Sequence, residues 1–323
     1  MIWWALRRLG AALLLAVLGT TVLILLVHLL PGDPLAGIIG DRALDPAAEA
    51  ALRARWGVDR PVWQVLSDFF AGAARGDLGA SMLEERPVRT ILGERLGPTL
   101  LLGGLTLLIN FTVGLALGAW TGLHPDTWRA RVAGTLSLVS YAVPAFVIAL
   151  LLVWIFAVQW PLFPAAGLAD PLIPADAGGW VVLRDRMMHL ALPLLTMVLA
   201  TIAVPMRHQR AAVQATRKAT WVTAAHARGV HPSRIAWRHV WRPALTPVVT
   251  LLGLWLPMLV SGAVFVEAVF AWPGIGSLIA GAAAARDVPV VIGAGALLIV
   301  MVQLGSLVAD VLYRVVDPEQ RDR

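Results

Sequence analysis

Long apolar stretches separated by short polar connections dominate this sequence. The first stretch, from Leu9 to Leu30, would rise about 33 Å as a helix, which is enough to cross a hydrocarbon layer of roughly 30 Å. It is longer than the roughly 7–15 apolar residues of a secretion signal. The Pro31-Gly32-Asp33-Pro34 sequence that follows contains no small-residue cleavage site. We therefore predict an uncleaved first membrane span.

Five further apolar stretches follow, which brings the predicted number of transmembrane helices to six. They are Thr99–Trp120, Val132–Val158, His189–Pro205, Pro247–Phe270 and Val288–Leu312. The pattern predicts an all-α, polytopic membrane protein.

The segment Pro31–Gly97, between the first two spans, carries helix signals of its own. Asp45 followed by Pro46 is typical of a helix start, and Gly57 is typical of a stop. A second helix is expected after Pro61. A third is predicted from apolar residues at helical spacing, namely Val88, Ile91, Leu92 and Leu96. We expect a small helical segment outside the bilayer.

These elements divide the chain into three predicted parts. Residues 1–97 hold the first transmembrane helix and the external helical segment. Residues 98–315 form the transmembrane core, and its longest cytoplasmic loop covers about residues 207–246. Residues 316–323 form a cytoplasmic tail.

Composition supports the membrane assignment. Apolar residues make up 59% of the chain and charged residues 14%, against about 45–50% and about 25% in soluble domains. The chain has no cysteine, which excludes disulfides and a cysteine nucleophile. Its net charge of +6 lies mainly in the loops predicted to be cytoplasmic. This is the positive-inside bias, so both termini are expected in the cytoplasm, with lipid headgroups rather than nucleic acid as charge partners.

The loop between Arg207 and Arg242 holds seven arginines, one lysine and no acidic residue. Within it, Trp221–Gly229 is predicted to form a short helix closed by Gly229, and Arg234–Trp241 to form a second helix. Two interpretations fit this composition: a solvated loop that sets orientation, or a docking surface for a partner. Composition alone does not separate them.

Thr223-Ala224-Ala225-x3-Gly229 resembles the E-A-A-x3-G coupling motif of ABC importer permeases. Threonine replaces the first glutamate, as in the peptide-importer branch, which also lacks it. Other motifs are similar to the dipeptide/oligopeptide/nickel importer permease family along the whole chain. They are Leu29–Pro34, Arg75–Gly79, Arg238-His239, Ala244–Pro247, Val269–Gly276, Ala285–Val290, Asp310–Tyr313 and Asp317-Pro318. Pro243 departs from the family pattern, which more often has asparagine there.

The resemblance implies a type I ABC importer permease core in the bacterial cytoplasmic (inner) membrane. It implies a permease subunit for peptides or similar small solutes that forms half of the translocation pathway. The implied partners are a second homologous permease, two ATP-binding subunits and an extracytoplasmic solute-binding protein. The implied ATPase-coupling residues are Trp221, Thr223, Ala224, Ala225, Arg228 and Gly229.

The chain carries no P-loop of its own, because its single lysine, Lys218, follows Arg217 rather than a glycine. ATP and Mg²⁺ are therefore expected in the partner ATPases, and no cofactor, metal site or catalytic residue is expected in this chain. No His-Glu pair of the kind used by membrane metalloproteases occurs. A secondary transporter or channel subunit is the alternative function, although no mid-span carboxylate or inverted repeat supports it.

Among the polar residues in the predicted spans, Asn110, Gln303 and Glu267 are the candidates for lining the pathway or for bonding between helices. Asn110 and Gln303 are neutral, and two roles fit them: hydrogen bonding between helices or lining a pathway. Glu267 lies near the outer end of the fifth predicted span, where it is expected either to accept hydrogen bonds from a nearby turn or to face the pathway. The sequence does not decide between these roles.

Overall fold

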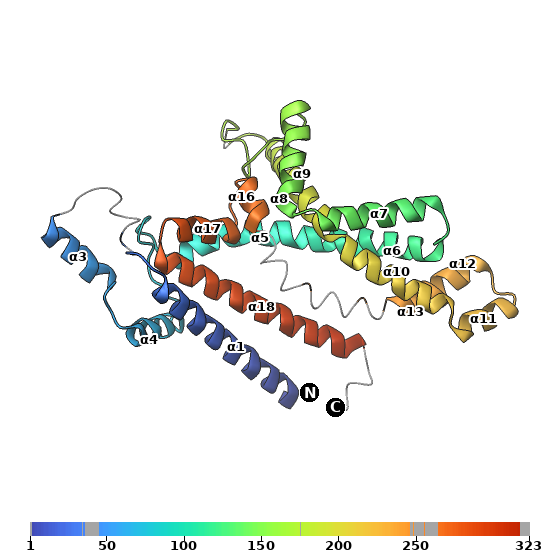
Figure 1. Cartoon of the computed structure of the whole chain (residues 1–323), viewed down its shortest axis with the longest axis horizontal. Helices are drawn as coiled ribbons and strands as arrows, with labels where there is room; N and C mark the ends of the chain where they lie inside the picture. The colour runs from blue at the N-terminus through green and yellow to red at the C-terminus, as the bar shows by residue number, and fades with distance from the viewer. Residues whose placement is uncertain are drawn as a thin grey trace. The chain divides into compact units, whose positions relative to one another are not determined.

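The computed structural model describes residues 2–33, 35, 45–174, 176–245, 248, 255 and 264–316. The named elements in these residues are all helices (Figure 1). The longer ones are α1 (Ile2–Leu29), α3 (Pro46–Trp56), α4 (Val62–Ala73), α5 (Val88–Ile109), α6 (Leu115–Leu123), α7 (Trp128–Ala142), α8 (Ala145–Val153), α9 (Gly179–Thr201), α10 (Ala203–Arg217), α11 (Thr220–Ala227), α17 (Ile275–Ala284) and α18 (Val288–Val316). The shorter ones are η1 (Asn110–Gly114), η2 (Trp154–Gln159), α12 (Pro232–Arg234), η3 (Ile235–Trp241), α13 (Arg242–Ala244) and α16 (Val264–Val269). The all-α prediction is confirmed for the described ranges.

Three helical stretches in these ranges are long and apolar enough to cross a membrane: Trp3–Leu29, Val88–Leu123 and Val288–Val311. The count rises to five if each of two bent helix pairs is one span. The α7–α8 pair, with η2, bends by 102° before Pro144, and the α9–α10 pair bends by 42°. Most of the fifth predicted span, Pro247–Phe270, lies outside the described residues, as does the tail after Val316.

The chain divides into two compact units. The first comprises residues 1–99 and 273–307, and the second comprises residues 100–272 and 308–323. In the first unit, α3 and α4 confirm the helices predicted after Pro46 and Pro61. Gly57 closes α3 in the left-handed conformation, with φ of +62°. The apolar core of the first unit is formed by the start of α5, by α17 and by α18. Its buried residues are Val88, Ile91, Leu92, Ile275, Ala282, Val290 and Ala294.

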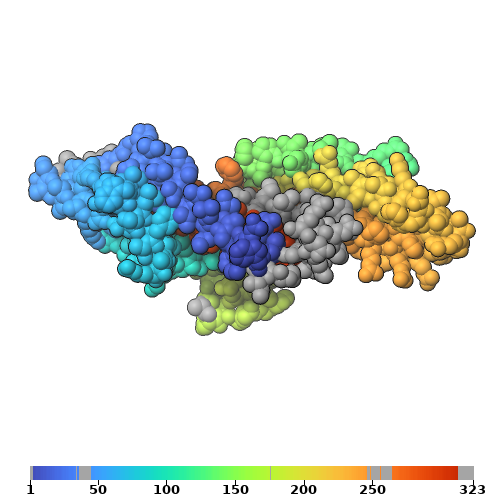
Figure 2. Space-filling view, turned by 90° about the horizontal axis from the view of Figure 1, so that it is seen from below, coloured from blue at the N-terminus to red at the C-terminus, as the bar shows by residue number. Residues whose placement is uncertain are grey.

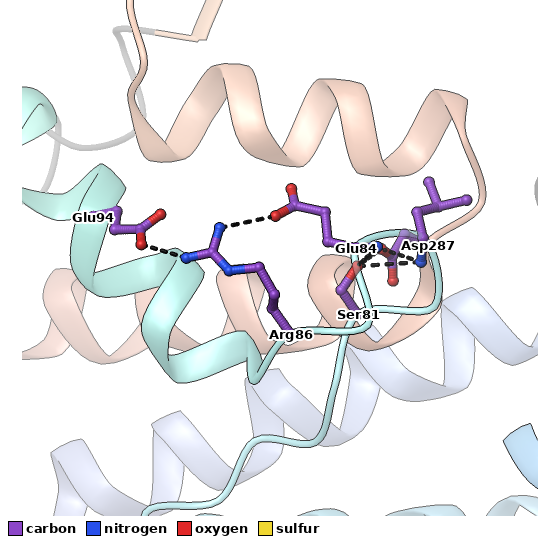
Figure 3. A network of polar contacts seen from close by, with 6 residues as sticks. Ser81, Glu84, Arg86, Glu94 and Asp287 are labelled. Carbon is purple, nitrogen blue, oxygen red and sulfur yellow. Dashed lines mark hydrogen bonds and ion pairs between the residues drawn. The ribbon is translucent and has the colours of Figure 1, made fainter.

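A buried carboxylate organises the loop before α5 in this unit. Asp287, only 3% exposed at the start of α18, accepts hydrogen bonds from the Ser81 hydroxyl and from the backbone N–H of Met82 at 3.1 Å (Figure 3). Beside it, Arg86 pairs with Glu94 and Glu84. The hydrogen bond to Glu94 and its charge raise the pKa of Arg86 above its ordinary value. The loop before α5 and the start of α18 therefore meet through polar contacts.

The third predicted external helix and the second predicted span are one helix in the structure. α5 continues from Val88 past Gly97 and Pro98 to Ile109. The apolar pattern has no polar turn between Leu96 and Thr99, so nothing stops the helix. A proline inside a membrane helix is tolerated when neighbouring groups satisfy the freed backbone.

The second unit packs the rest of α5 with the helices from α6 to α16. One core, formed by α5, α8, α9 and the chain around α16, contains the fully buried Trp272 and Phe270 together with Leu102, Ile148 and Leu192. A second core lies where α6 and α10 meet the basic loop. That loop carries the candidate site.

Candidate functional site

The predicted docking helix is present as α11, Thr220–Ala227, and its two faces differ. Val222 is 3% exposed and Ala225 is fully buried. Trp221, with 53% of its surface exposed, Thr223 and Ala224 face outward. We call the exposed face of Trp221, Thr223, Ala224 and Arg228 the docking face. Ala225 lies on the opposite, inner face.

Gly229 ends this helix in the way that the sequence predicts. Its φ is +72°, a left-handed conformation that costs other residues roughly 1–2 kcal/mol. The N–H of Gly229 donates to the carbonyl of His226 at 2.9 Å, and the N–H of Val230 donates to that of Ala225 at 3.2 Å. These two bonds form a Schellman motif, which satisfies carbonyls left free at the helix end.

The inner face of α11 is packed against the rest of the unit. Its core contains Ala119 of α6, Val213 of α10 and, from the loop, Val222, Ala225, Ile235, Val240 and Ala244. The second predicted helix, Arg234–Trp241, is helical but mainly π-helical, as η3. Trp221 donates its indole N–H to the carbonyl of His239 at 3.3 Å, which ties α11 to η3. The segment from α10 to α13, yellow to orange, forms one end of this unit's surface (Figure 2).

The basic loop is joined to the rest of the second unit by a close crossing of α6 and α10. A Cβ on Gly118 would lie 2.4 Å from the carbonyl oxygen of Met206, so only glycine fits at this separation. A Cβ on Gly122 would lie 2.8 Å from the side chain of Val213 and 3.0 Å from the carbonyl oxygen of Arg210. Such small residues at four-residue spacing let membrane helices approach closely. α6 and α10 therefore pack closely against each other.

Arg217, at the end of α10, adds hydrogen bonds to this crossing of α6 and α10. Its guanidinium donates to the carbonyls of Gly122 at 3.1 Å and Leu123 at 2.9 Å, which lie at the end of α6. Sequence reasoning did not single out Arg217, because nothing distinguishes it from the other loop arginines. The Gly118-x3-Gly122 spacing was a visible signal that it also passed over.

The three polar span residues lie in different surroundings. Asn110 is fully buried, and its amide donates to the Thr201 hydroxyl at 2.7 Å, a bond between η1 and α9. Gln303 is half-buried and lines a cavity of about 450 Å³ between α1 and α18. Glu267 is fully buried in α16. Gln303 belongs to the first unit, and Asn110 and Glu267 belong to the second. No cluster of three or more potential metal ligands occurs among the described residues.

Comparison with known proteins decides the family. The family described as "binding-protein-dependent transport system inner membrane component" matches residues 114–322, which include α11 and the α6–α10 crossing. The chain belongs to this family. It is a multi-pass inner-membrane permease subunit of an ABC importer, and such a subunit works with an ATPase and a binding protein.

Relatives of this permease match it along nearly its whole length. A putative peptide permease of Brucella ovis is 33% identical, with 98% of each chain covered. A dipeptide transport system permease of Escherichia coli K12 is 31% identical over all of both chains. A glutathione transport system permease of Escherichia coli O6:H1 is 32% identical, covering 94% of this chain and 93% of its own. The family is one of transport permeases.

Proposed function

We propose that this permease carries peptides or similar small solutes and that α11 receives the force from the ATPase subunits. The observation that carries the coupling role is the division of α11 into two faces. Val222 and Ala225 are buried against α6 and α10, whereas Trp221, Thr223 and Ala224 remain exposed. A helix held this firmly on one side transmits a push as a rigid body.

The docking face suits a protein partner. Ala224 and Thr223 are small and allow close approach, while Trp221 provides a large apolar contact of the kind enriched at interfaces. Arg228 ends the helix with a positive charge, and the loop from Arg207 to Arg242 contains no acid to neutralise it. An acidic groove on the ATPase is the matching surface.

In this proposal two homologous permease chains form the pathway, two ATPase subunits bind ATP and Mg²⁺, and this chain holds no cofactor. Its single lysine is Lys218, which caps α10 rather than following a phosphate-binding glycine loop. Peptides are the proposed cargo because relatives matched over 93% or more of their length are named as peptide, dipeptide and glutathione permeases. Six spans with both termini in the cytoplasm complete the proposal.

Ala224→Asp tests the docking role, with Ala71→Asp on the exposed side of α4 as a matched control. We expect a tagged Ala224→Asp chain to insert normally but to recover at least tenfold fewer ATPase subunits than wild type, whereas Ala71→Asp recovers them all. Equal recovery by both variants would rule out the docking face as the contact.

Cargo is tested separately, by reconstituting the complete transporter in proteoliposomes with its binding protein. We expect ATP-dependent uptake of a labelled dipeptide, and unlabelled glutathione in excess measures how far the two solutes share the system. Uptake that runs on an ion gradient without ATP would point to a secondary transporter instead.

A further inference from the structure

A cavity of about 520 Å³ lies between α7 and α10 in the second unit. Both helices contact each other and lie side by side, green and yellow, in Figures 1 and 2. Three arginines line the cavity: Arg131 from α7 and Arg207 and Arg210 from α10. No acidic residue lines it, and neutral hydrogen-bonding groups are added by Thr135, Ser137 and Gln214. The cavity is suited to an anion.

The arginines are held in place without being neutralised. Arg210 is half-buried. Its guanidinium lies 2.7 Å from where a Cβ on Gly134 would be, so the guanidinium fits there only because residue 134 is a glycine. Within the described part of the chain, Arg207 and Arg210 have no hydrogen bond or ion pair. Arg131 donates only to the backbone carbonyl of Asp126, at 3.0 Å. Arg131 and Arg207 are exposed and Arg210 is half-buried, and no carboxylate among the described residues pairs with any of the three. Guanidinium groups without an acidic partner favour binding of a phosphate oxyanion.

The cavity opens beside an apolar face of α7. Leu138 belongs to its lining and is 49% exposed. The neighbouring Leu136, Val139 and Val132 are also exposed. Such an exposed apolar face is as apolar as lipid tails and is available to acyl chains, so a charged pocket and an apolar face adjoin each other. A ligand that matches both has an anionic head and a hydrocarbon tail.

We propose that this cavity binds the phosphate headgroup of an anionic phospholipid, whose acyl chains lie along the exposed face of α7. The proposal rests on the proposed orientation, which places the loop after α6 in the cytoplasm, where the leaflet surface is negatively charged. A phosphate shared by Arg131 and Arg210 links α7 to α10. Because α10 leads directly into α11, the lipid stabilises the helix that supports the docking face.

Native mass spectrometry of the detergent-purified transporter tests this proposal, with phosphatidylglycerol and phosphatidylcholine as probes. We expect the wild type to retain phosphatidylglycerol in preference to phosphatidylcholine. The double variant Arg207→Gln/Arg210→Gln should retain at least tenfold less. The matched control Arg184→Gln/Arg186→Gln removes two arginines from α9 and should retain the wild-type amount. Arg207→Lys/Arg210→Lys keeps the charge and should restore most of the binding.

Three results would overturn the lipid assignment. One is equal retention by the wild type and the Gln double variant, with both folded by size-exclusion chromatography. Another is displacement of the lipid by millimolar inorganic phosphate, which identifies a free-phosphate site. A third is a wild-type complex without lipid in which Arg210 crosslinks to an acidic residue of a partner. Retention is measured without transport, so a negative result here is distinct from failure of the proposed import function.

Discussion

Replacing Gly118 by alanine tests whether the crossing of α6 and α10 holds the docking loop in place. The added Cβ would lie 2.4 Å from the carbonyl oxygen of Met206 and 2.8 Å from the Cβ of Gln209, both below ordinary contact distance. The nearest atom belongs to the backbone, so no side-chain rotation relieves the clash, and the helices must move apart. Overpacking of this kind costs about 1–3 kcal/mol.

Gly104→Ala is the matched control, because a Cβ there meets nothing within 4 Å. Both substitutions gain about the same helix propensity, roughly 1 kcal/mol, so their difference isolates the clash. Thermal unfolding of the purified chain in detergent, followed by tryptophan fluorescence, measures this difference. We expect Gly118→Ala to unfold several degrees below Gly104→Ala, since 1 kcal/mol shifts the midpoint by roughly 2–4 °C in chains of about 150–250 residues.

The crossing also predicts a graded series. Gly114→Ala meets side-chain atoms of Ile202 at 3.2 Å, which can move, so its effect should fall between those of Gly104→Ala and Gly118→Ala. The same variants, assembled with their ATPase partners, should lose solute-stimulated ATP hydrolysis in the same order. Identical midpoints for Gly118→Ala and Gly104→Ala would show that the helices do not cross as closely as the structure has them.

Three further changes have defined outcomes. Arg217→Gln removes the hydrogen bonds to the carbonyls of Gly122 and Leu123 and should reduce the solute transported per ATP. Arg217→Lys should restore part of this ratio. An unchanged ratio in Arg217→Gln would show that Arg217 has no role in holding α10 against α6. Gly229→Ala should destabilise the end of α11 by roughly 1–2 kcal/mol, seen as faster amide exchange there, because φ of +72° disfavours alanine. Asp287→Asn weakens hydrogen bonds to a charged group and should cost about 1.5–3 kcal/mol in thermal unfolding; no change would contradict its anchoring role.

The sequence determined the class of the protein and the local structure of its candidate site. Apolar stretches of bilayer length follow from the cost of exposing polar backbone to lipid, so they are readable without coordinates. Gly229 ends α11 as predicted, because the left-handed conformation at a helix end is a local property. The helix Pro46–Trp56 could be predicted for the same reason, since Pro46 favours a helix start and Gly57 a helix end through their own backbone conformations.

Tertiary structure decided which residues of the site face outward and what holds them. Ala224 and Ala225 are chemically identical, and only packing against α6 and α10 buries the second while leaving the first exposed. Arg217 and Arg210 look alike in sequence, yet Arg217 donates hydrogen bonds to carbonyls at the end of α6 and Arg210 lines a cavity. The bends at α7–α8 and α9–α10 were also hidden, because periodicity reports which residues are apolar and not the direction in which a helix continues. These properties depend on contacts between distant parts of the chain, which the order of residues alone does not specify.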